Sequence, residues 1–423
     1  MPLGFLIWLM LGVLVGLVWA VRLAMLGSIL RKRSILHSAS YDGPPEPSPR
    51  VTVLVAAKDE EDNIEVCIET MLKQDYPNFE IVAIDDRSGD RTPAILRRLA
   101  QRAGGKLRVV TVTQLREGWF GKNNAMREGV SIATGDWLCF TDADCRQTST
   151  KTLTVAMQEV LAKNIDFLSI TPLLETKAAW ERMTQPVCAF VLMLWFLPQR
   201  VNDPSKKTAY ANGAFMLMRR RCYEAIGGHE RVRTEINEDI QMARIAKRTG
   251  FGLRVCENDD LYSTRMYRTM GDSWRGWSRI FYGSLATLPR LLIAAAALAG
   301  FALGPWVSTA AALIGRWSAS AETADMWSLM LGIWACTLCL MQVVLWRLYP
   351  VLKISHGWSL TYPFGASIAL GMLGNAMLKV VGATGTTWRG TRYRGHVIDP
   401  MTHNQESRDP EESSPVEETV ADG

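Results

Sequence analysis

Two carboxylates stand two residues apart in the segment CFTDADCRQ, residues 139–147. The apolar run at 137–141 predicts a buried strand, so Asp142 and Asp144 would lie where that strand leaves a sheet. Asp is a common turn former, because its side chain accepts hydrogen bonds from nearby backbone. Two carboxylates at this spacing can also bind a hard divalent cation, Mg²⁺ or Mn²⁺, which can in turn bind a diphosphate. The pair alone is compatible with both roles.

Acidic pairs also follow two earlier apolar runs. Asp59–Glu60 come just after VTVLVAA (51–57), and Asp85–Asp86 stand at the end of the run FEIVAID (79–85). Helical patterns separate these runs, and this alternation predicts a mainly parallel sheet covered by helices. Ligands of such sheets bind outside the carboxyl ends of the strands. Three acidic groups at that edge therefore favour a shared cation or nucleotide site over ordinary turns.

The beginning of the chain predicts a membrane anchor. The chain has 423 residues and is 48% hydrophobic, and residues 3–21 carry no charge. This run is long enough to span a bilayer. It lacks the basic residues that precede the apolar core of a signal peptide. Basic residues follow at Arg22 and 31–33, so the positive-inside rule predicts that the chain beyond them is cytoplasmic. We expect an anchor over 1–30 and a Ser- and Pro-rich linker over 31–49.

Three more apolar stretches predict a C-terminal transmembrane region over 289–385. They are 291–315, 326–346 and 358–382. Three full spans would leave the arginines of 389–394 outside, against the positive-inside rule. The alternative is that one stretch enters the bilayer only partly, and the sequence leaves both possibilities open. The acidic segment 386–423 is predicted to be a disordered tail.

The remaining composition narrows the partners. Without the acidic tail the chain is basic, which suits an anionic membrane face or a phosphate-bearing substrate. Membrane segments at both ends argue against a nucleic-acid partner. The five histidines show no metal-ligand spacing, and the sequence does not indicate an oligomeric state.

Five segments occur in an order and spacing that resemble a known family. They are LVAAKDEEDNIEVCIETMLKQDYPNFEIVAIDDRSGDRT, GKNNAMREG, FTDADC, NGAFMLMRR and INEDIQMARIAKRTG. Over about residues 50–285 the chain resembles a membrane-anchored family 2 glycosyltransferase. The resemblance implies an α/β fold of the GT-A type in a catalytic domain over 50–262, with one N-terminal and about three C-terminal transmembrane segments. The overall sequence pattern is most similar to the branch of this family that acts on lipids such as ceramide, hopanoids or carotenoids.

The resemblance also implies roles in binding a nucleoside-diphosphate sugar. Asp144 would be the direct ligand of Mg²⁺ or Mn²⁺, and Asp142 would contact the sugar nucleotide or hold a metal-bound water. Four acidic residues would line the nucleoside pocket, with Asp86 preferred over its neighbour for the base or ribose: Asp59, Glu60, Asp85 and Asp86. Lys122 lies at the start of a predicted helix, where a cation and backbone N–H groups favour phosphate. A solvated surface lysine is the alternative.

The family places its catalytic base in a Glu-Asp pair that corresponds to Glu238 and Asp239. The alternative is that acids in the first turn of a helix only complement its dipole. A hydroxyl is a poor nucleophile at neutral pH, so transfer with inversion needs a base beside it. We expect Asp239 to be this base and Glu238 to lie on the acceptor side.

A basic amphipathic helix is predicted over 263–288. Its apolar residues recur at helical spacing: Met270, Trp274, Trp277 and Phe281. Such a helix suits the membrane interface, with Trp274, Arg275, Trp277 and Phe281 near the lipid or the acceptor. Packing on the domain's own core is the alternative. The family's Gln-x-x-Arg-Trp motif is incomplete here, since Gly276 holds the Arg position and Arg275 comes one residue early, which argues against processive polymer synthesis.

These observations predict an inverting glycosyltransferase. It would be a multi-pass protein of the plasma membrane with a cytoplasmic catalytic domain. It would move a sugar from a nucleoside-diphosphate donor, which we expect to be a UDP-sugar, to a lipid acceptor. Two alternatives are a polysaccharide synthase of the same family and a non-catalytic membrane protein that binds nucleotide or metal.

Overall fold

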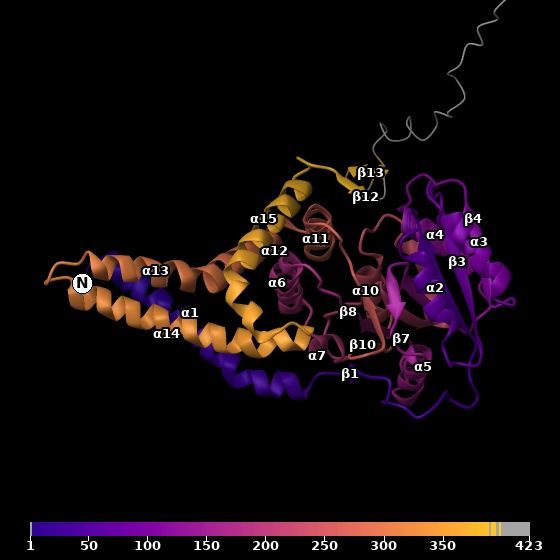
Figure 1. Ribbon diagram of the computed structural model, residues 1–423, viewed down its shortest axis with the longest axis horizontal. Coiled ribbons are helices and arrows are strands. Elements are labelled where there is room, and N and C mark those ends of the chain that lie inside the picture. Colours follow the sequence, from indigo (N-terminus) through magenta and orange to yellow (C-terminus); the bar gives the residue numbers. More distant parts are fainter. Residues whose placement is uncertain (1, 389–390, 395–396, 399–423) are drawn as a thin grey trace, which may run out of the picture.

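The molecule has a globular α/β part and an elongated helical part (Figure 1). The computed structural model describes residues 2–388, 391–394 and 397–398. The elongated part contains α1 (Leu3–Arg31), α13 (Gly304–Trp317) and α14 (Ala324–Leu348), and α14 packs against both of the others. The globular part follows α1 in the chain, and α13 and α14 return to lie beside α1, away from the sheet (Figure 1).

The globular part is built on an eight-stranded sheet. In spatial order its strands are β1 (Ile35–Leu36), β10 (Leu253–Asn258), β7 (Phe167–Thr171), β9 (Phe215–Arg219), β5 (Trp137–Asp142), β2 (Val51–Ala57), β3 (Phe79–Asp86) and β4 (Leu107–Val112). Neighbouring strands are parallel except at β9, which is antiparallel to both β5 and β7. The mainly parallel sheet predicted from the sequence is therefore confirmed.

Alternate residues of the central strand β2 support two hydrophobic cores. Val53 and Val55 belong to a core with Ile64, whereas Leu54 belongs to a different core with Met126. Helices cover both faces of the sheet, which is why its strands are apolar without interruption. The helices of the globular part are α2 (Ile64–Leu72), α3 (Thr92–Arg102), α4 (Gly121–Ile132), α5 (Thr152–Ala162), α7 (Pro198–Val201), α8 (Arg220–Ala225), α9 (Gly228–Arg231) and α10 (Glu238–Arg248).

A small second sheet extends the carboxyl edge of the large one. Its order is β6 (Cys145–Gln147), β11 (Tyr262–Thr264) and β8 (Leu173–Leu174), with β11 antiparallel to β6 and parallel to β8. The turn between β5 and β6 carries Asp144. Because β6 is paired on its outer side, this turn is held between two sheets rather than at the end of a free loop.

The segment 31–49, predicted as a linker, contributes structure of its own. Its residues Ile35–Leu36 form β1 and pair in parallel with β10. Nε of Arg33 also donates to the Glu257 carboxylate at 3.0 Å. The chain leaving α1 is thus joined directly to the edge of the sheet.

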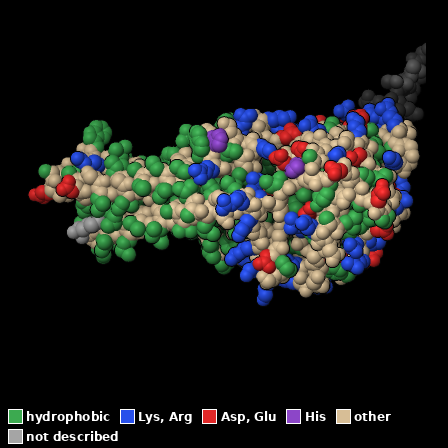
Figure 2. Space-filling view, turned by 90° about the horizontal axis from the view of Figure 1, so that it is seen from below, with side chains coloured by type: hydrophobic (Ala, Val, Ile, Leu, Met, Phe, Trp, Pro, Cys, Tyr) green, Lys and Arg blue, Asp and Glu red, His purple; other side chains and the backbone are tan. Residues whose placement is uncertain are grey.

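Three helical segments of the described chain are long and apolar enough to cross a membrane. They are Leu3–Arg31, Leu288–Trp317 and Ala324–Leu352. The second comprises α12 (Leu288–Ala297), the π-helical η1 (Leu298–Leu303) and α13, and the third comprises α14 and the 3₁₀ helix η2 (Tyr349–Leu352). Figure 2 shows hydrophobic side chains covering the elongated part, with Lys and Arg side chains gathered where it meets the globular part.

The fourth expected span is corrected by the structure. The stretch 358–382 forms η3 (His356–Thr361) and α15 (Tyr362–Val380), which is not among these three candidates. α15 packs instead on α6 (Ala179–Trp195) and α11 (Met270–Leu285). Small residues such as Ala366 and Ala369 are fully buried there, because they allow close approach to neighbouring helices. The apolar residues of this stretch therefore pack on other helices of the protein.

If the three candidate segments are the spans, the segment after α14 lies on the side of the sheet. Arg392 and Arg394 would then agree with the positive-inside rule. The predicted disordered tail, 386–423, begins instead with a small antiparallel sheet of β12 (Thr386–Trp388), β13 (Thr391–Arg394) and β14 (Val397–Ile398). Residues 399–423 of that tail lie outside the described residues.

Candidate active site

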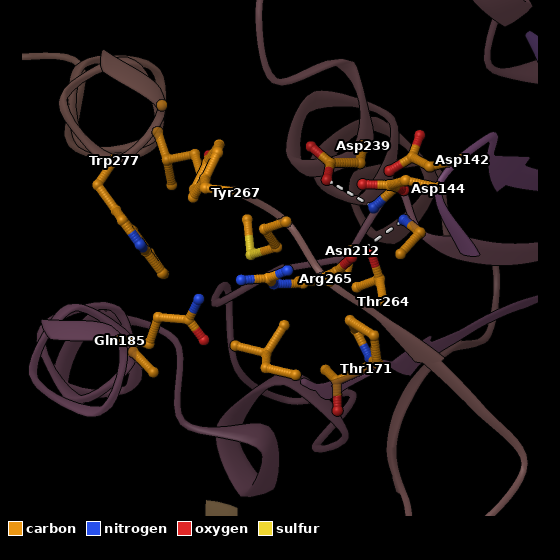
Figure 3. A pocket seen from close by; sticks show the side chains of 18 of the residues that line it. Asp142, Asp144, Thr171, Gln185, Asn212, Asp239, Thr264, Arg265, Tyr267 and Trp277 are labelled. Atoms are coloured by element: carbon orange, nitrogen blue, oxygen red, sulfur yellow. Dashed lines mark hydrogen bonds between the residues drawn. The ribbon is translucent and has the colours of Figure 1, made fainter. Parts of the chain in front are cut away.

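A cavity of about 740 Å³ lies at the carboxyl edge of the sheet and has two chemically different walls. The acidic wall comes from the ends of β2, β3 and β5 and from the start of α10. The helical wall comes from α6, α11, the end of η2 and Ile354. Figure 3 shows Asp142, Asp144 and Asp239 together on one side, with Gln185 and Trp277 across the cavity. The predicted acidic residues are therefore brought to one place.

Lys122 stands at the centre of the acidic wall. Its Nζ lies 2.7 Å from Oδ1 of Asp142 and 2.9 Å from Oε1 of Glu238. Burial alone would lower the pKa of Lys122, but the two carboxylates outweigh it and raise that pKa well above its ordinary value. Lys122 is thus a charged link between the end of β5 and the start of α10, not a solvated surface lysine.

Asp144 is half-buried beside other carboxylates. Burial raises its pKa to about 7, and the negative charges of Asp142 and Glu60 act in the same direction. No group of three or more His, Cys, Asp or Glu side chains in the described residues is arranged to hold a metal. Mg²⁺ and related ions are commonly held by one or two carboxylates together with substrate phosphates and water. Asp144 and Asp142 fit that mode, because a cation would relieve the repulsion that disfavours the Asp144 carboxylate.

Asp239 is fixed by the backbone around it. Its Oδ2 accepts the Gly213 N–H at 2.8 Å, and its Oδ1 accepts the Ile240 N–H at 2.7 Å. Burial raises the pKa of Asp239 to about 7, with a further contribution from Glu238. A carboxylate with a pKa near neutrality is suited to accept a proton in a reaction at pH 7.

The start of α10 is positioned by α11. Asn237 precedes α10, and its side chain makes no capping bond to that helix. Its Nδ2 donates instead to Oγ of Ser284 at 2.9 Å and to the Ile280 carbonyl at 3.3 Å, both on α11. The two walls of the cavity are therefore connected at Asn237, next to Glu238 and Asp239.

The ends of β2 and β3 supply the rest of the acidic wall. Asp59, Glu60 and Asp86 line the cavity. Asp59 has a left-handed backbone (φ 53°), and its carboxylate accepts the Gly89 N–H at 2.8 Å. Asp85 is buried, accepts the Ser88 N–H at 3.3 Å, and has a pKa raised by burial. Of the pair at the end of β3, Asp86 is thus the one on the cavity.

This geometry agrees with comparisons to known proteins. Residues 52–227 match the family model described as Glycosyl transferase family 2. Residues 52–227 thus form a family 2 glycosyltransferase domain. The resemblance inferred from its motifs is confirmed.

Two curated relatives and one solved structure show the extent of the similarity. The 4,4'-diaponeurosporenoate glycosyltransferases of Staphylococcus haemolyticus and Staphylococcus aureus are 24% identical over 274 residues and 25% identical over 250 residues. The alignments cover 63% and 58% of this chain and 70% and 64% of those relatives. A Pyrobaculum calidifontis mannosyltransferase in complex with GDP-Man and Mn²⁺ has a TM-score of 0.50 at 19% identity, covering 80% of this chain and 99% of that one. That likeness shows the GT-A fold.

In this glycosyltransferase α11 lies on protein, which corrects the expected membrane-interface helix. Trp277 and Phe281 are buried, and α11 packs against α6 and α15. Trp274 packs on α15 so closely that a Cβ added at Gly371 would lie 2.5 Å from its ring. The alternative interpretation, packing on the protein's own core, describes this helix. Its apolar face is largely covered by α6 and α15.

The incomplete Gln-x-x-Arg-Trp motif has a structural reason. Gly276 lies under the Tyr267 ring, and any side chain at this position would overlap that ring. Tyr267 and Trp277 both line the cavity. Arg275 also borders the cavity, but its side chain is exposed and pairs with Asp272 at 2.6 Å. A tyrosine from the β11–α11 connection thus takes the place that an arginine at 276 would need.

Several cavity residues of the glycosyltransferase were missed by the sequence interpretation. Gln185 on α6, Arg265 after β11 and Tyr267 line the cavity beside Trp277. The signal for Gln185 was available, because it is a lone amide next to Pro186 at the start of an apolar run. Arg265 and Tyr267 carried no comparable signal, since their position depends on the pairing of β11 with β6.

Proposed function

We propose that this glycosyltransferase moves a sugar from a nucleoside-diphosphate donor to a lipid acceptor with inversion at the anomeric carbon. The observation that carries the proposal is that the acidic wall and the largely apolar helical wall enclose the same cavity. The acidic wall suits the donor diphosphate and the proton transfer. The apolar wall suits a hydrocarbon chain.

The donor would occupy the ends of β2, β3 and β5. Asp144 and Asp142 would hold the cation, Mg²⁺ or Mn²⁺, while Asp86 and the pair Asp59–Glu60 would contact the nucleoside, which we expect to be uridine. When bound, the cation neutralises charge on the departing diphosphate. The similar mannosyltransferase in complex with GDP-Man and Mn²⁺ supports this donor class.

Asp239 would act as the general base. Its carboxylate oxygens are oriented by two backbone N–H groups, and its raised pKa makes it a better proton acceptor than an ordinary aspartate. It would remove the proton from an acceptor hydroxyl as the hydroxyl oxygen attacks the anomeric carbon from the face opposite the diphosphate. Glu238, held by Lys122, would keep α10 in register with Asp142.

The acceptor would lie along the helical wall. Leu192, Met193 and Phe196 of α6 line one side, and Leu352 and Ile354 line the other. Leu352 ends the third candidate span, so the apolar lining is continuous with a segment that could cross a bilayer. The relatives' name, 4,4'-diaponeurosporenoate glycosyltransferase, supports a long apolar acceptor.

The protein would be a multi-pass protein of the plasma membrane with its globular part on the cytoplasmic face. Arg22, the basic cluster 31–33, Arg290 and Arg347 all flank the ends of spans on the side of the sheet. Such a bias of basic residues supports a cytoplasmic position for that side. Cytoplasmic sugar nucleotides would then reach the acidic wall directly.

A polymer-forming synthase is less well supported. Export of a polymer needs a helical channel, and the described chain has three candidate spans in total. The covered α11 and the missing arginine at 276 also differ from the processive pattern.

Lipid analysis tests the proposal. Full-length protein in nanodiscs made from bacterial lipid extract would be given radiolabelled UDP-sugars with Mn²⁺ or Mg²⁺. We expect label in an organic-extractable product whose mass exceeds that of its lipid by one sugar, and no such product with Asp239→Asn. A long water-soluble polymer would contradict lipid transfer, whereas no turnover of any nucleotide sugar would contradict the enzyme assignment.

A further inference from the structure

A polar cluster interrupts the apolar wall of the cavity. Gln185 of α6, Trp277 of α11 and Arg265 after β11 point toward the same part of it (Figure 3). Gln185 is 2% exposed and Trp277 is 3% exposed. Within the described residues, neither the amide atoms of Gln185 nor the indole Nε1 of Trp277 has a hydrogen-bond partner. We call these three residues the amide–indole–guanidinium cluster.

Unpaired polar groups of this kind are unfavourable in a folded protein. A buried donor or acceptor without a partner loses its hydration and gains nothing in return. Methionine would fill the space of Gln185 without that loss, and phenylalanine would supply most of the Trp277 ring. The unpaired groups therefore indicate a ligand that completes their hydrogen bonds.

Arg265 is held so that it can complete this cluster. Its Nε donates to Oε1 of the fully buried Glu181 at 2.9 Å. The other oxygen of Glu181 accepts the backbone N–H of Ala178 at 2.6 Å and that of Lys177. Glu181 thereby fixes Arg265 through Nε alone, and the outer guanidinium N–H groups extend into the cavity (Figure 3).

The chemistry of the cluster selects its ligand. Arginine and tryptophan side chains only donate hydrogen bonds, and the glutamine amide supplies two more donors and one acceptor. Donors that converge in a water-poor site match a group with several acceptor oxygens. A carboxylate or a phosphate has such oxygens, and its negative charge strengthens each bond.

We infer that the amide–indole–guanidinium cluster binds an anionic group on the lipid acceptor, a carboxylate or a phosphate, with the hydrocarbon chain along Leu192, Met193 and Phe196. The inference rests on the proposed lipid acceptor. The anionic group would lie across the cavity from Asp144 and Asp239, where it does not face their negative charges (Figure 3). The acceptor would thus be fixed by its anion at one point while a hydroxyl elsewhere on the molecule meets Asp239.

Equilibrium binding of radiolabelled amphiphiles to the full-length protein in non-ionic detergent tests the inference. The probes are a long-chain carboxylate, an alkyl phosphate and a primary alcohol of equal chain length, together with acetate and inorganic phosphate. Gln185→Met and Trp277→Phe remove the unpaired groups while keeping most of the bulk. Leu161→Met, on the exposed surface of α5, is the matched control.

We expect at least one long-chain anion to bind about 10-fold or more tightly than the alcohol, the scale of hydrogen bonds to a charged group. The carboxylate and phosphate probes distinguish the two anions, and the short anions show whether the chain is required. Gln185→Met should abolish the preference without lowering the Tm, because it removes an unpaired polar group. Trp277→Phe should reduce the preference in the same direction.

Three results would overturn the inference. They are equal binding of anions and alcohol, an unchanged preference in Gln185→Met, and weakened UDP binding in Gln185→Met, which would assign the cluster to the donor. These outcomes are separate from failure of the proposed function. Glycosylation of neutral lipids with no preference for anions would refute only the cluster's role, whereas absence of any glycosylated lipid would refute the proposed function.

Discussion

The two walls of the cavity differ in how completely they are built before any ligand binds. On the acidic wall, Asp239 accepts two backbone N–H groups and Lys122 bridges two carboxylates. On the helical wall, Gln185 and Trp277 are buried without partners among the described residues. Strand ends and a helix start fix the first wall, whereas three helices assemble the second. The donor end of the cavity is thus preorganised for chemistry. At the acceptor end, the unpaired polar groups indicate which ligand would bind.

The largest effect is expected at Asp239, where the acidic wall would do its chemistry. Asp239→Asn keeps the shape of the side chain but removes the base, so transfer should fall by about 10²-fold or more. UDP affinity in the presence of Mn²⁺ should stay near that of the parent protein. Single-turnover transfer of radiolabelled sugar measures the first quantity, and calorimetry measures the second.

Glu230→Gln is the control for this change, because Glu230 is an exposed acid outside the cavity. It should leave both quantities unaltered. If Asp239→Asn transferred sugar at the parental rate, Asp239 would not be the general base. Glu238 would then be the next residue to examine.

The second effect concerns the cation. Asp144→Asn removes one carboxylate from the group that a cation would bind. Metal-dependent UDP affinity should therefore fall by at least the roughly 10- to 100-fold that loss of an outer-shell partner costs. Calorimetry of UDP with and without Mn²⁺ gives this difference. If UDP affinity depended on Mn²⁺ equally in the parent protein and in Asp144→Asn, Asp144 would only form the turn and would not bind the cation. Repeating the titration with Mg²⁺ identifies which ion the site prefers.

The third effect tests the helical wall. Ala189 of α6 lines the cavity, and Ala189→Phe would narrow the apolar side of the cavity. We expect a cost of about 1–3 kcal/mol for any occupant, which is roughly a 5- to 150-fold rise in acceptor KM. Hydrolysis of the donor by water should stay unchanged, since it needs no acceptor. Leu161→Phe on the exposed face of α5 serves as the control. Equal loss of transfer and hydrolysis would mean that the two walls do not act separately.

The smallest effect is a shift in pH dependence. The pKa of Asp239 is raised to about 7, and a base must be deprotonated, so kcat should fall as the pH drops through 7. The Lys122 charge opposes this rise, and Lys122→Met should therefore move the fall in kcat to higher pH. Lys122→Arg, which keeps the charge, should hold the profile closer to the parental one. A shift to lower pH in Lys122→Met would contradict the assignment of the profile to Asp239.

The acidic wall could be predicted from the sequence, whereas the helical wall could not. Carboxyl ends of parallel strands meet at one edge, so Asp59, Asp86 and Asp142 could be grouped once the strands were recognised. The apolar spacing of 270–281 is the same whether a helix lies on lipid or on other helices. Only the contacts of α6 and α15 with that helix distinguish the two cases.

Two further differences between the sequence predictions and the structure have similar causes. The stretch 358–382 is apolar enough to suggest a span, but its small residues pack against α6 and α11. Lys122 was assigned to phosphate or to solvent, because its distances to Asp142 and Glu238 depend on residues far away in the chain. Local patterns thus predicted the elements, while contacts between distant segments decided the roles of these residues.

The short connection between α1 and β1 determines how the enzyme meets its acceptor. α1 ends at Arg31 and β1 begins at Ile35, with Arg33 paired to Glu257 at the sheet edge. Under the proposed topology this leaves no tether on which the catalytic part could swing away from the bilayer. Encounters with the acceptor would then be collisions between two molecules diffusing in a plane. The quantity that governs occupancy would be the number of acceptor molecules per unit of membrane area, and dilution of the cytoplasm would leave it unchanged.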